Sequence, residues 1–252
     1  YNVSETLSLD TGIQTTYYNF NPGFIRPLTE SSGFNDKQLQ QKFAAEASIY
    51  VSAEHELSPA LALRYGVRVN QFNRLAQSGL ERYANDQPIV YNAALGIYQE
   101  ATPIGTYSKE ESTASFTNFE PRLTLVYRTK KSAWKASYQR VHQYLHLISN
   151  TSSPTPLDVW TTSGKYLQPQ RADQWAIGFA TERDNGNSFE AESFYKITKN
   201  RYDYIDGAEL VANEALERIL LAGKGRAYGL ELLFKKTQGN VCLLYTSPSP
   251  RD

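Results

Sequence analysis

The sequence has no methionine, one cysteine and no long apolar run, and each shortage narrows the class of protein. No stretch reaches the roughly 18 apolar residues that a membrane-spanning helix needs, so a helical membrane protein is excluded. The single cysteine, Cys242, cannot form an internal disulfide, and cysteine usage therefore leaves the redox compartment open. Because neither a methionine nor a signal peptide opens the chain, we expect a fragment of a longer protein.

The sequence also lacks a charge imbalance and a catalytic constellation. Lys plus Arg and Asp plus Glu both number 26, so no net field attracts nucleic acid, and we predict no nucleic-acid partner. Three scattered histidines offer no nucleophile with a base beside it. The segment "AGKGRAYG" lacks the phosphate-loop frame. We predict neither an enzyme nor a cofactor.

Alternation of apolar and polar residues is the dominant pattern in the chain. In "ALALRYGVRVNQF", Leu63, Tyr65 and Val67 face one way while Arg64 and Arg68 face the other. Similar segments predict an all-β fold of about eight long antiparallel strands, most of them longer than the about 5 to 6 residues usual in soluble sheets. The predicted strands are 5–20, 42–56, 60–75, 115–129, 132–146, 171–183, 188–203 and 225–238.

The connections between these strands are alternately short and long. "LSPA", "TKKS" and "RDNGN" are hairpin turns, whereas the other connections have about 20 to 37 residues. All turns then lie at one end of the sheet and all long loops at the other. This is typical of a transmembrane β-barrel, with short periplasmic turns and long extracellular loops. We therefore predict that 1–240 is part of an outer-membrane barrel domain.

The barrel interpretation assigns a face to each polar residue. Carboxylates and guanidinium groups in the strands occupy the positions that alternate with the apolar residues. They therefore face away from lipid, into a water-filled lumen. On the lipid side, a Lys or Arg at the midplane would cost about 2–4 kcal/mol. Aromatic residues near strand ends are suited to the membrane interfaces, although aromatic packing in a soluble core would produce the same pattern. The lumen set is Glu46, Ser48, Glu54, Arg64, Arg68, Glu120, Arg122, Glu190, Glu192 and Glu231, and the interface set is Tyr17, Tyr65, Tyr127, Trp134 and Trp175.

Several segments resemble the barrel domain of TonB-dependent outer-membrane receptors, especially the Bacteroidetes type. They include "YYNFNPGFIRPL", "YVSAEHELSPALALRYGVRVNQF", "NFEPRLTLVYR", "KYLQPQRADQWAIGFA" and "GRAYGLELLFKK", in an order that spans about residues 5 to 238. The resemblance implies a 22-stranded plugged barrel in the bacterial outer membrane. It also implies active import of a scarce nutrient, with TonB, the plug domain, outer-membrane lipid and a surface lipoprotein as partners.

Two other functions fit the same pattern. One is a passive porin or adhesin barrel without a plug, and the other is a soluble carbohydrate-binding β-protein. The sequence does not identify a substrate.

Candidate ligand-binding residues lie in the long loops and in the lumen. Loops on a rigid scaffold often bind ligands, although the same aromatic residues can instead pack loops against each other. The loop candidates are Tyr83, Tyr91, Tyr98, Tyr107, Trp160 and Tyr166, and the lumen candidates are Arg64, Arg68 and Arg122. "NEALERILLAG" at 213–223 predicts a short helix on a loop, with partner binding as the alternative.

The histidines do not predict a metal site. His142 and His146 have the spacing of a helical zinc pair, but on a strand they would lie about 13 Å apart. His55 in "EHEL" lacks the second histidine of a zinc protease.

The last residues differ from the rest of the chain. "CLLYTSPSPRD" has no alternation and resembles translated sequencing-adapter sequence, so we expect 241–252 to be a non-native or disordered tail. Because Pro248 and Pro250 cannot donate to a ladder, we expect no strand after the turn at "TQGN".

Overall fold

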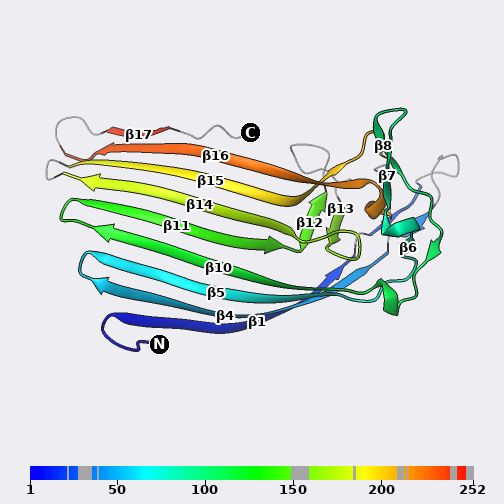
Figure 1. Ribbon diagram of the computed structural model, residues 1–252, viewed down its shortest axis with the longest axis horizontal. Coiled ribbons are helices and arrows are strands. Elements are labelled where there is room, and N and C mark those ends of the chain that lie inside the picture. Colours follow the sequence, from blue (N-terminus) through cyan, green and yellow to red (C-terminus); the bar gives the residue numbers. More distant parts are fainter. Residues whose placement is uncertain are drawn as a thin grey trace.

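The structure, a computed structural model, describes residues 1–21, 23–27, 36–38, 40–148, 159–183, 186–208, 213, 215–238 and 243–247. These residues contain one nine-stranded sheet in the order β1-β4-β5-β10-β11-β14-β15-β16-β17 (Figure 1). Every neighbouring pair in the sheet is antiparallel. The prediction of an all-β antiparallel meander is confirmed.

The long strands account for most of the sheet. They are β1 (Leu7–Phe20), β4 (Lys42–Ser58), β5 (Leu61–Arg74), β10 (Ala114–Arg128), β11 (Ser132–Gln143), β14 (Gln170–Glu182), β15 (Asn187–Tyr204) and β16 (Leu220–Lys236), followed by the short β17 (Leu243–Ser247). The eight long strands lie where the sequence predicts them. The largest difference in bounds is at β16, which begins at Leu220 and not at 225.

Turns and loops are sorted to opposite ends of the sheet (Figure 1). Two residues join β4 to β5 and three join β10 to β11, whereas the long connections gather at the other end, here named the outer end. They carry small elements: β2 (Phe24–Ile25), β3 (Lys37–Gln38), β6 (Glu81–Arg82), β7 (Ile89–Asn92), β8 (Ile97–Glu100), β9 (Gly105–Thr106), β12 (Leu145–Ile148), β13 (Val159–Thr162) and the 3-10 turns η1 (Ala84–Asp86), η2 (Glu110–Ser112) and η3 (Leu216–Arg218). This sorting is the one expected of periplasmic turns and extracellular loops.

The register gives the sheet one apolar face and one polar face. Directly paired residues share a face, as in the row Tyr65, Leu123, Tyr138 and Trp175, which belongs to the apolar face. Apolar side chains on this face are largely open: Ile13 is 77%, Ile177 64% and Leu230 57% exposed. The interface aromatics predicted from sequence are among them, since Tyr17, Tyr65, Tyr127, Trp134 and Trp175 are 40–64% exposed. An apolar surface of this extent fits lipid.

Buried apolar side chains concentrate at the outer end. One cluster contains residues from the end of β12, the loop before β14, the position directly after β15 and the segment from η3 into β16. Its members are Ile148, Leu167, Ile205, Leu216, Ile219 and Leu220. A second joins Ala44 and Phe72 on the polar face of the sheet to Tyr144, which precedes β12. Because these clusters cross between loops and strands, the loops are packed onto the sheet at this end.

The helix predicted at 213–223 is wrong. Among the residues described there, Leu216–Arg218 form one 3-10 turn, and Leu220–Gly223 belong to β16, paired with Arg201–Tyr204. The apolar spacing has another cause, because Leu216, Ile219 and Leu220 enter the outer-end cluster. Within the described ranges, no helix has the length and apolarity needed to cross a membrane.

The expectation that no strand follows β16 is also wrong for part of the tail. Leu243–Ser247 pair with Leu232–Lys236 as β17. This segment contains no proline, so each of its residues can donate to the ladder. Cys242, Pro248 and Pro250 lie outside the described residues, and the non-native origin of 241–252 stays a prediction.

Candidate ligand-binding site

The polar face holds a hollow of about 680 Å³ between β1 and β15. It is lined by predicted lumen residues and by others of the same face, including Asp10, Gln14, Tyr50, Arg64, Arg68, Glu120, Arg122, Lys135, Gln174 and Glu192. Charges of both signs alternate across it. The sequence-based placement of Arg64, Arg68 and Arg122 on one polar face is therefore found in the structure, although their role as ligand contacts stays a prediction.

The three arginines of this hollow differ in how they are held. Arg68 donates from Nε to Asn70 Oδ1 at 2.7 Å and from Nη2 to Gln14 Oε1 at 3.1 Å, with Glu46 at 3.9 Å. Arg64 pairs with Glu54 at 2.7 Å while both side chains stay about half exposed or more. Arg122 has no ion pair among the described residues. Arg122 is thus the arginine most open to an anionic group in the lumen.

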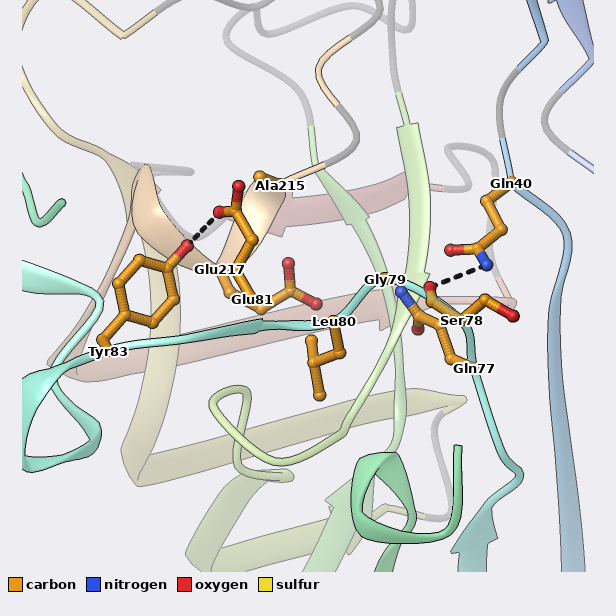
Figure 2. A pocket seen from close by; sticks show the side chains of 9 residues that line it. All are labelled: Gln40, Gln77, Ser78, Gly79, Leu80, Glu81, Tyr83, Ala215 and Glu217. Carbon is orange, nitrogen blue, oxygen red and sulfur yellow. Dashed lines mark hydrogen bonds between the residues drawn. The ribbon is translucent and has the colours of Figure 1, made fainter. Parts of the chain in front are cut away.

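A second cavity, of about 540 Å³, lies among the outer-end loops (Figure 2). Its lining comes from three segments, Gln40 before β4, 77–83 after β5, and the η3 region at 215–217. Gln40 Nε2 donates to the Ser78 carbonyl at 2.9 Å and ties the first two segments together. Since β5 passes the hollow at Arg64 and Arg68 and leads into Gln77, one strand connects the two spaces.

Carboxylates give the outer cavity its charge. Glu81 accepts a hydrogen bond from the Tyr83 hydroxyl and lies 3.6 Å from Arg218 Nη1, whose Nε lies 2.8 Å from Glu100. Burial first, and then the Glu81 carboxylate, raise the pKa of Tyr83, so its hydroxyl stays protonated and can donate. Glu217 has no hydrogen bond or ion pair within the described part of the chain. The cavity therefore presents a partly buried carboxylate without a direct partner among the described residues, and its charge interacts with the buried Arg74 guanidinium. Beside it lie the amides of Gln40 and of Gln77, whose oxygen accepts from Arg74 Nη2.

Three of the predicted loop aromatics meet in one cluster. Tyr83 packs edge-on against Tyr166 with ring centroids 5.5 Å apart, and the Tyr166 hydroxyl lies 3.4 Å from that of Tyr107. The Lys165 ammonium lies 4.1 Å from the centroid of the Tyr107 ring. Tyr83 is only 2% exposed. In this cluster Tyr83 packs loops together, and it also lines the outer cavity.

The other loop aromatics are open to solvent. Tyr91 and Tyr98 face each other across the β7-β8 hairpin with centroids 5.1 Å apart and are 58% and 43% exposed. Trp160 in β13 is 51% exposed. The structure does not bring these three residues into the cavity lining.

Two of the three histidines, His142 and His146, lie beside polar side chains in the described region. His142 Nδ1 lies 3.4 Å from Glu120. His146 is 1% exposed, and its ring nitrogens lie 3.0 Å from Ser163 Oγ and 3.2 Å from Gln170 Nε2. Burial lowers the pKa of His146 to about 4. No group of three or more possible metal ligands occurs among the residues that the structure describes.

Sequence reasoning missed the polar lining of the outer cavity. Gln40, Gln77, Glu81 and Glu217 lie in loops where polar residues are expected anyway, so nothing in their local pattern separates them from a solvated surface. The only available signal was the apolar spacing around Leu216, which does mark the segment that closes the cavity.

Comparison with known proteins identifies the family. The family model described as TonB dependent receptor-like, beta-barrel, matches residues 1–245. The chain belongs to this family. Members of this family are bacterial outer-membrane proteins, which locates the chain in that membrane.

Solved structures of three transporters share the fold. The FrpB iron transporter from Neisseria meningitidis, in its F5-1 apoprotein form, has a TM-score of 0.57 at 14% identity over 94% of this chain and 32% of its own. The copper transporter OprC has a TM-score of 0.57 at 11% identity, over 96% and 36%. The ferric-catecholate import receptor Fiu from K12 E. coli has a TM-score of 0.52 at 16% identity, over 93% and 33%. A comparison with curated protein sequences finds no match.

The chain spans about a third of the length of these structures. It corresponds to one section of a barrel wall, with the outer loops that this section carries.

Proposed function

We propose that the protein containing this chain actively imports a scarce nutrient across the outer membrane, with energy relayed by TonB. Membership in the TonB-dependent receptor barrel family supports this proposal. The chain supplies a lipid-facing wall, a polar lumen face and outer loops. A plug domain, TonB and a surface lipoprotein are the proposed partners.

The observation that supports import most directly is the pair of spaces along β5. The outer cavity lies among the outer-end loops, including the one that follows β5. The hollow with Arg68 and Arg122 lies beside β5 itself, nearer to the turns. A solute that binds among the loops would next meet the charged lumen face. A wall that served only as a membrane anchor would not need two polar hollows along one strand.

The lining of the outer cavity favours a small solute that donates hydrogen bonds. Glu217 offers a carboxylate without a direct partner in the described ranges, and Gln40 offers the oxygen of its amide. The Gln77 oxygen, in contrast, already accepts from Arg74 Nη2. The volume is within the about 300–1,000 Å³ usual for small-molecule sites. Hydroxyl or amino groups match these acceptors. The neighbours' titles name iron, copper and a ferric catecholate as cargo, so a metal complex with such groups is within the proposed class.

Depletion of nutrients from the medium tests the proposal without a known substrate. Cells producing the complete receptor, cells lacking it, and receptor-bearing cells without TonB are grown in a defined mixture, and the remaining solutes are measured by mass spectrometry. We expect at least one solute to be depleted only in the first strain. Equal depletion without TonB would indicate a passive pore and would overturn the proposal.

A matched pair of variants tests the assigned cavity. Glu217→Gln removes the partly buried carboxylate, and we expect depletion to slow. Glu182→Gln removes an exposed carboxylate beside a turn at the opposite end of the sheet and should leave depletion unchanged.

A further inference from the structure

A row of aromatic side chains crosses four neighbouring strands on the apolar face. Tyr138, Trp175, Tyr195 and Tyr228 are directly paired from β11 through β14 and β15 to β16. Ring centroids of Trp175 lie 5.3 Å from Tyr138 and 6.3 Å from Tyr195. Tyrosine and tryptophan are typical of the boundary between lipid tails and headgroups. The row therefore marks where this part of the wall leaves the hydrocarbon, on the side of the long loops.

Basic residues follow this row immediately toward the outer end. The next two positions on the same face hold five cations and one anion, whereas toward the turns the face continues with apolar residues such as Ile177 and Leu230. We name the cations Arg140, Arg171, Lys199, Lys224 and Arg226 the basic patch.

One carboxylate organises the arginines of the basic patch. Asp173 Oδ1 lies 2.7 Å from Arg140 Nε, and its Oδ2 lies 3.0 Å from Arg171 Nε. Asp173 also accepts from the Tyr138 hydroxyl at 2.8 Å and is only 5% exposed. Both guanidinium groups are thus held in place, yet a single negative charge cannot neutralise both.

The remaining three cations are open. Lys199, Lys224 and Arg226 are exposed, and none has an ion pair within the described ranges. Lys199 is directly paired in register with Arg171 on one side and with Lys224 on the other. With neighbouring strands about 4.8 Å apart, the patch extends over about 14 Å across the strands, enough to contact more than one anionic group.

The other half of the sheet lacks this feature. Beyond the apolar stretch of the same face, β10, β5, β4 and β1 carry uncharged residues at two successive levels: Thr117, Gln71, Ala47 and Thr15, then Ser115, Asn73, Ala45 and Tyr17. A general preference for cations near the surface would have placed them on all strands. The positive charge is instead confined to one side of the wall.

Position and charge together specify the partner. A cation on a lipid-facing strand costs about 2–4 kcal/mol at the midplane but little at the interface, so the basic patch belongs at headgroup depth. It lies on the loop side of the aromatic row and hence in the outer leaflet. Guanidinium and ammonium groups bind phosphate through charge-assisted hydrogen bonds. We propose that the basic patch binds the phosphate groups of an outer-leaflet lipid.

This binding site is separate from the import path, because the patch is on the face opposite the lumen arginines. Its test uses the complete receptor in detergent, with lipopolysaccharide as the probe and its dephosphorylated form as the second arm. Inorganic phosphate is added in a third arm. Bound lipid is quantified by native mass spectrometry during titration at low ionic strength.

We expect the wild type to bind the phosphorylated lipid and to lose affinity when the lipid phosphates are removed. Lys199→Gln, Lys224→Gln and Arg226→Gln combined should weaken binding on the order of 100-fold. Lys196→Gln is the matched control, because Lys196 is on β15 but pairs with Gln174 of the polar face. It should bind like the wild type.

The proposal is overturned if the triple variant, shown folded by its heat-dependent gel migration, binds as tightly as the wild type. Equal binding of dephosphorylated lipid, or an equal loss in Lys196→Gln, would also overturn it. If millimolar inorganic phosphate displaces the bound lipid as effectively as added lipid does, the site binds free phosphate and not a lipid. If the triple variant does not fold, two other measurements replace it. Lipid binding should weaken in Lys199→Gln alone, and wild-type lipid binding should weaken as the salt concentration rises, because salt screens the attraction between cations and phosphate. Unchanged binding in both measurements would overturn the proposal.

Discussion

Replacing Phe72 by alanine tests whether the loop before β12 is fastened to the barrel wall by an aromatic stack. Phe72 on β5 is fully buried and stacks on Tyr144, with ring centroids 4.6 Å apart and planes 3° from parallel. The Tyr144 hydroxyl accepts a hydrogen bond from Asn118 Nδ2 at 3.1 Å, which fixes the ring over β10.

The size of the effect follows from this burial. Truncating a buried phenylalanine costs about 3–5 kcal/mol, which includes the transfer of the ring and the cavity left behind. β5 itself is held by full ladders to β4 and β10, so the sheet should survive. The lost free energy should instead lower the local stability of the segment that Tyr144 anchors. A loss of about 3 kcal/mol there corresponds to about a 100-fold loss of protection of its amides against hydrogen exchange.

Hydrogen exchange read by mass spectrometry on the complete receptor provides the measurement. We expect faster exchange in Phe72→Ala for peptides covering 144–148 and 159–163, with the strands of the sheet unchanged. Phe119→Ala is the matched control, because Phe119 is 60% exposed on the apolar face and touches no loop cluster. Unchanged exchange in the Phe72 variant, or equal changes in both variants, would refute the anchoring role.

Three further predictions concern other parts of the wall and loops. His146 should make stability sensitive to acid. Its pKa in the folded state, about 4, lies below the usual 6.5, so the unfolded state binds the proton first as the pH falls. About 3 kcal/mol of unfolding free energy that is present above pH 6.5 is therefore lost as the pH falls toward 4. The melting temperature of His146→Gln should therefore vary less over this range. Tyr91→Ala and Trp160→Ala should leave the melting temperature nearly unchanged, because both side chains are more than half exposed. Both variants test the sequence prediction that the loop aromatics bind ligand beyond the lining of the outer cavity, which requires that they lower ligand affinity. Gly66→Ala should lower stability by about 1–3 kcal/mol, since its Cβ would lie 2.6 Å from the Val51 carbonyl oxygen.

Each of these predictions has its own contradicting result. Parallel pH profiles for wild type and His146→Gln would show that the buried ring does not set the acid response. Unaltered affinity in both aromatic variants would remove the open loop aromatics from the binding surface. Gly178→Ala is the control for Gly66, because its Cβ would meet only ordinary contacts, the nearest at 3.5 Å, and equal destabilisation of the two would refute the steric argument.

The barrel wall could be predicted from sequence because each strand carries its own evidence. In β5, Tyr65 and Val67 alternate with Arg64 and Arg68, and a period of two assigns each residue to a face without knowledge of its neighbours. The turns after Ser58 and Arg128 then fix which ends of the strands are adjacent.

The outer cavity could not be predicted in this way. It depends on contacts between residues far apart in the chain, such as Glu81 with Arg218 and Gln40 with Ser78. The apolar spacing around Leu216 indicated a helix because burial in a loop cluster and burial on a helical face produce the same short pattern. In the structure, Leu216, Ile219 and Leu220 pack in the loop cluster, and Leu220 begins β16, so the spacing reflects tertiary packing and not a helix.

The steady-state concentration of the imported solute in the periplasm, relative to the medium, tests the central claim of active import most directly. The comparison uses cells whose inner-membrane uptake of that solute is deleted, before and after collapse of the proton gradient. We expect the ratio to exceed one in energised cells with the complete receptor and to fall to one after collapse, because TonB then relays no energy. A ratio of one in energised cells, unchanged by the collapse, would mean passive permeation and would contradict the account.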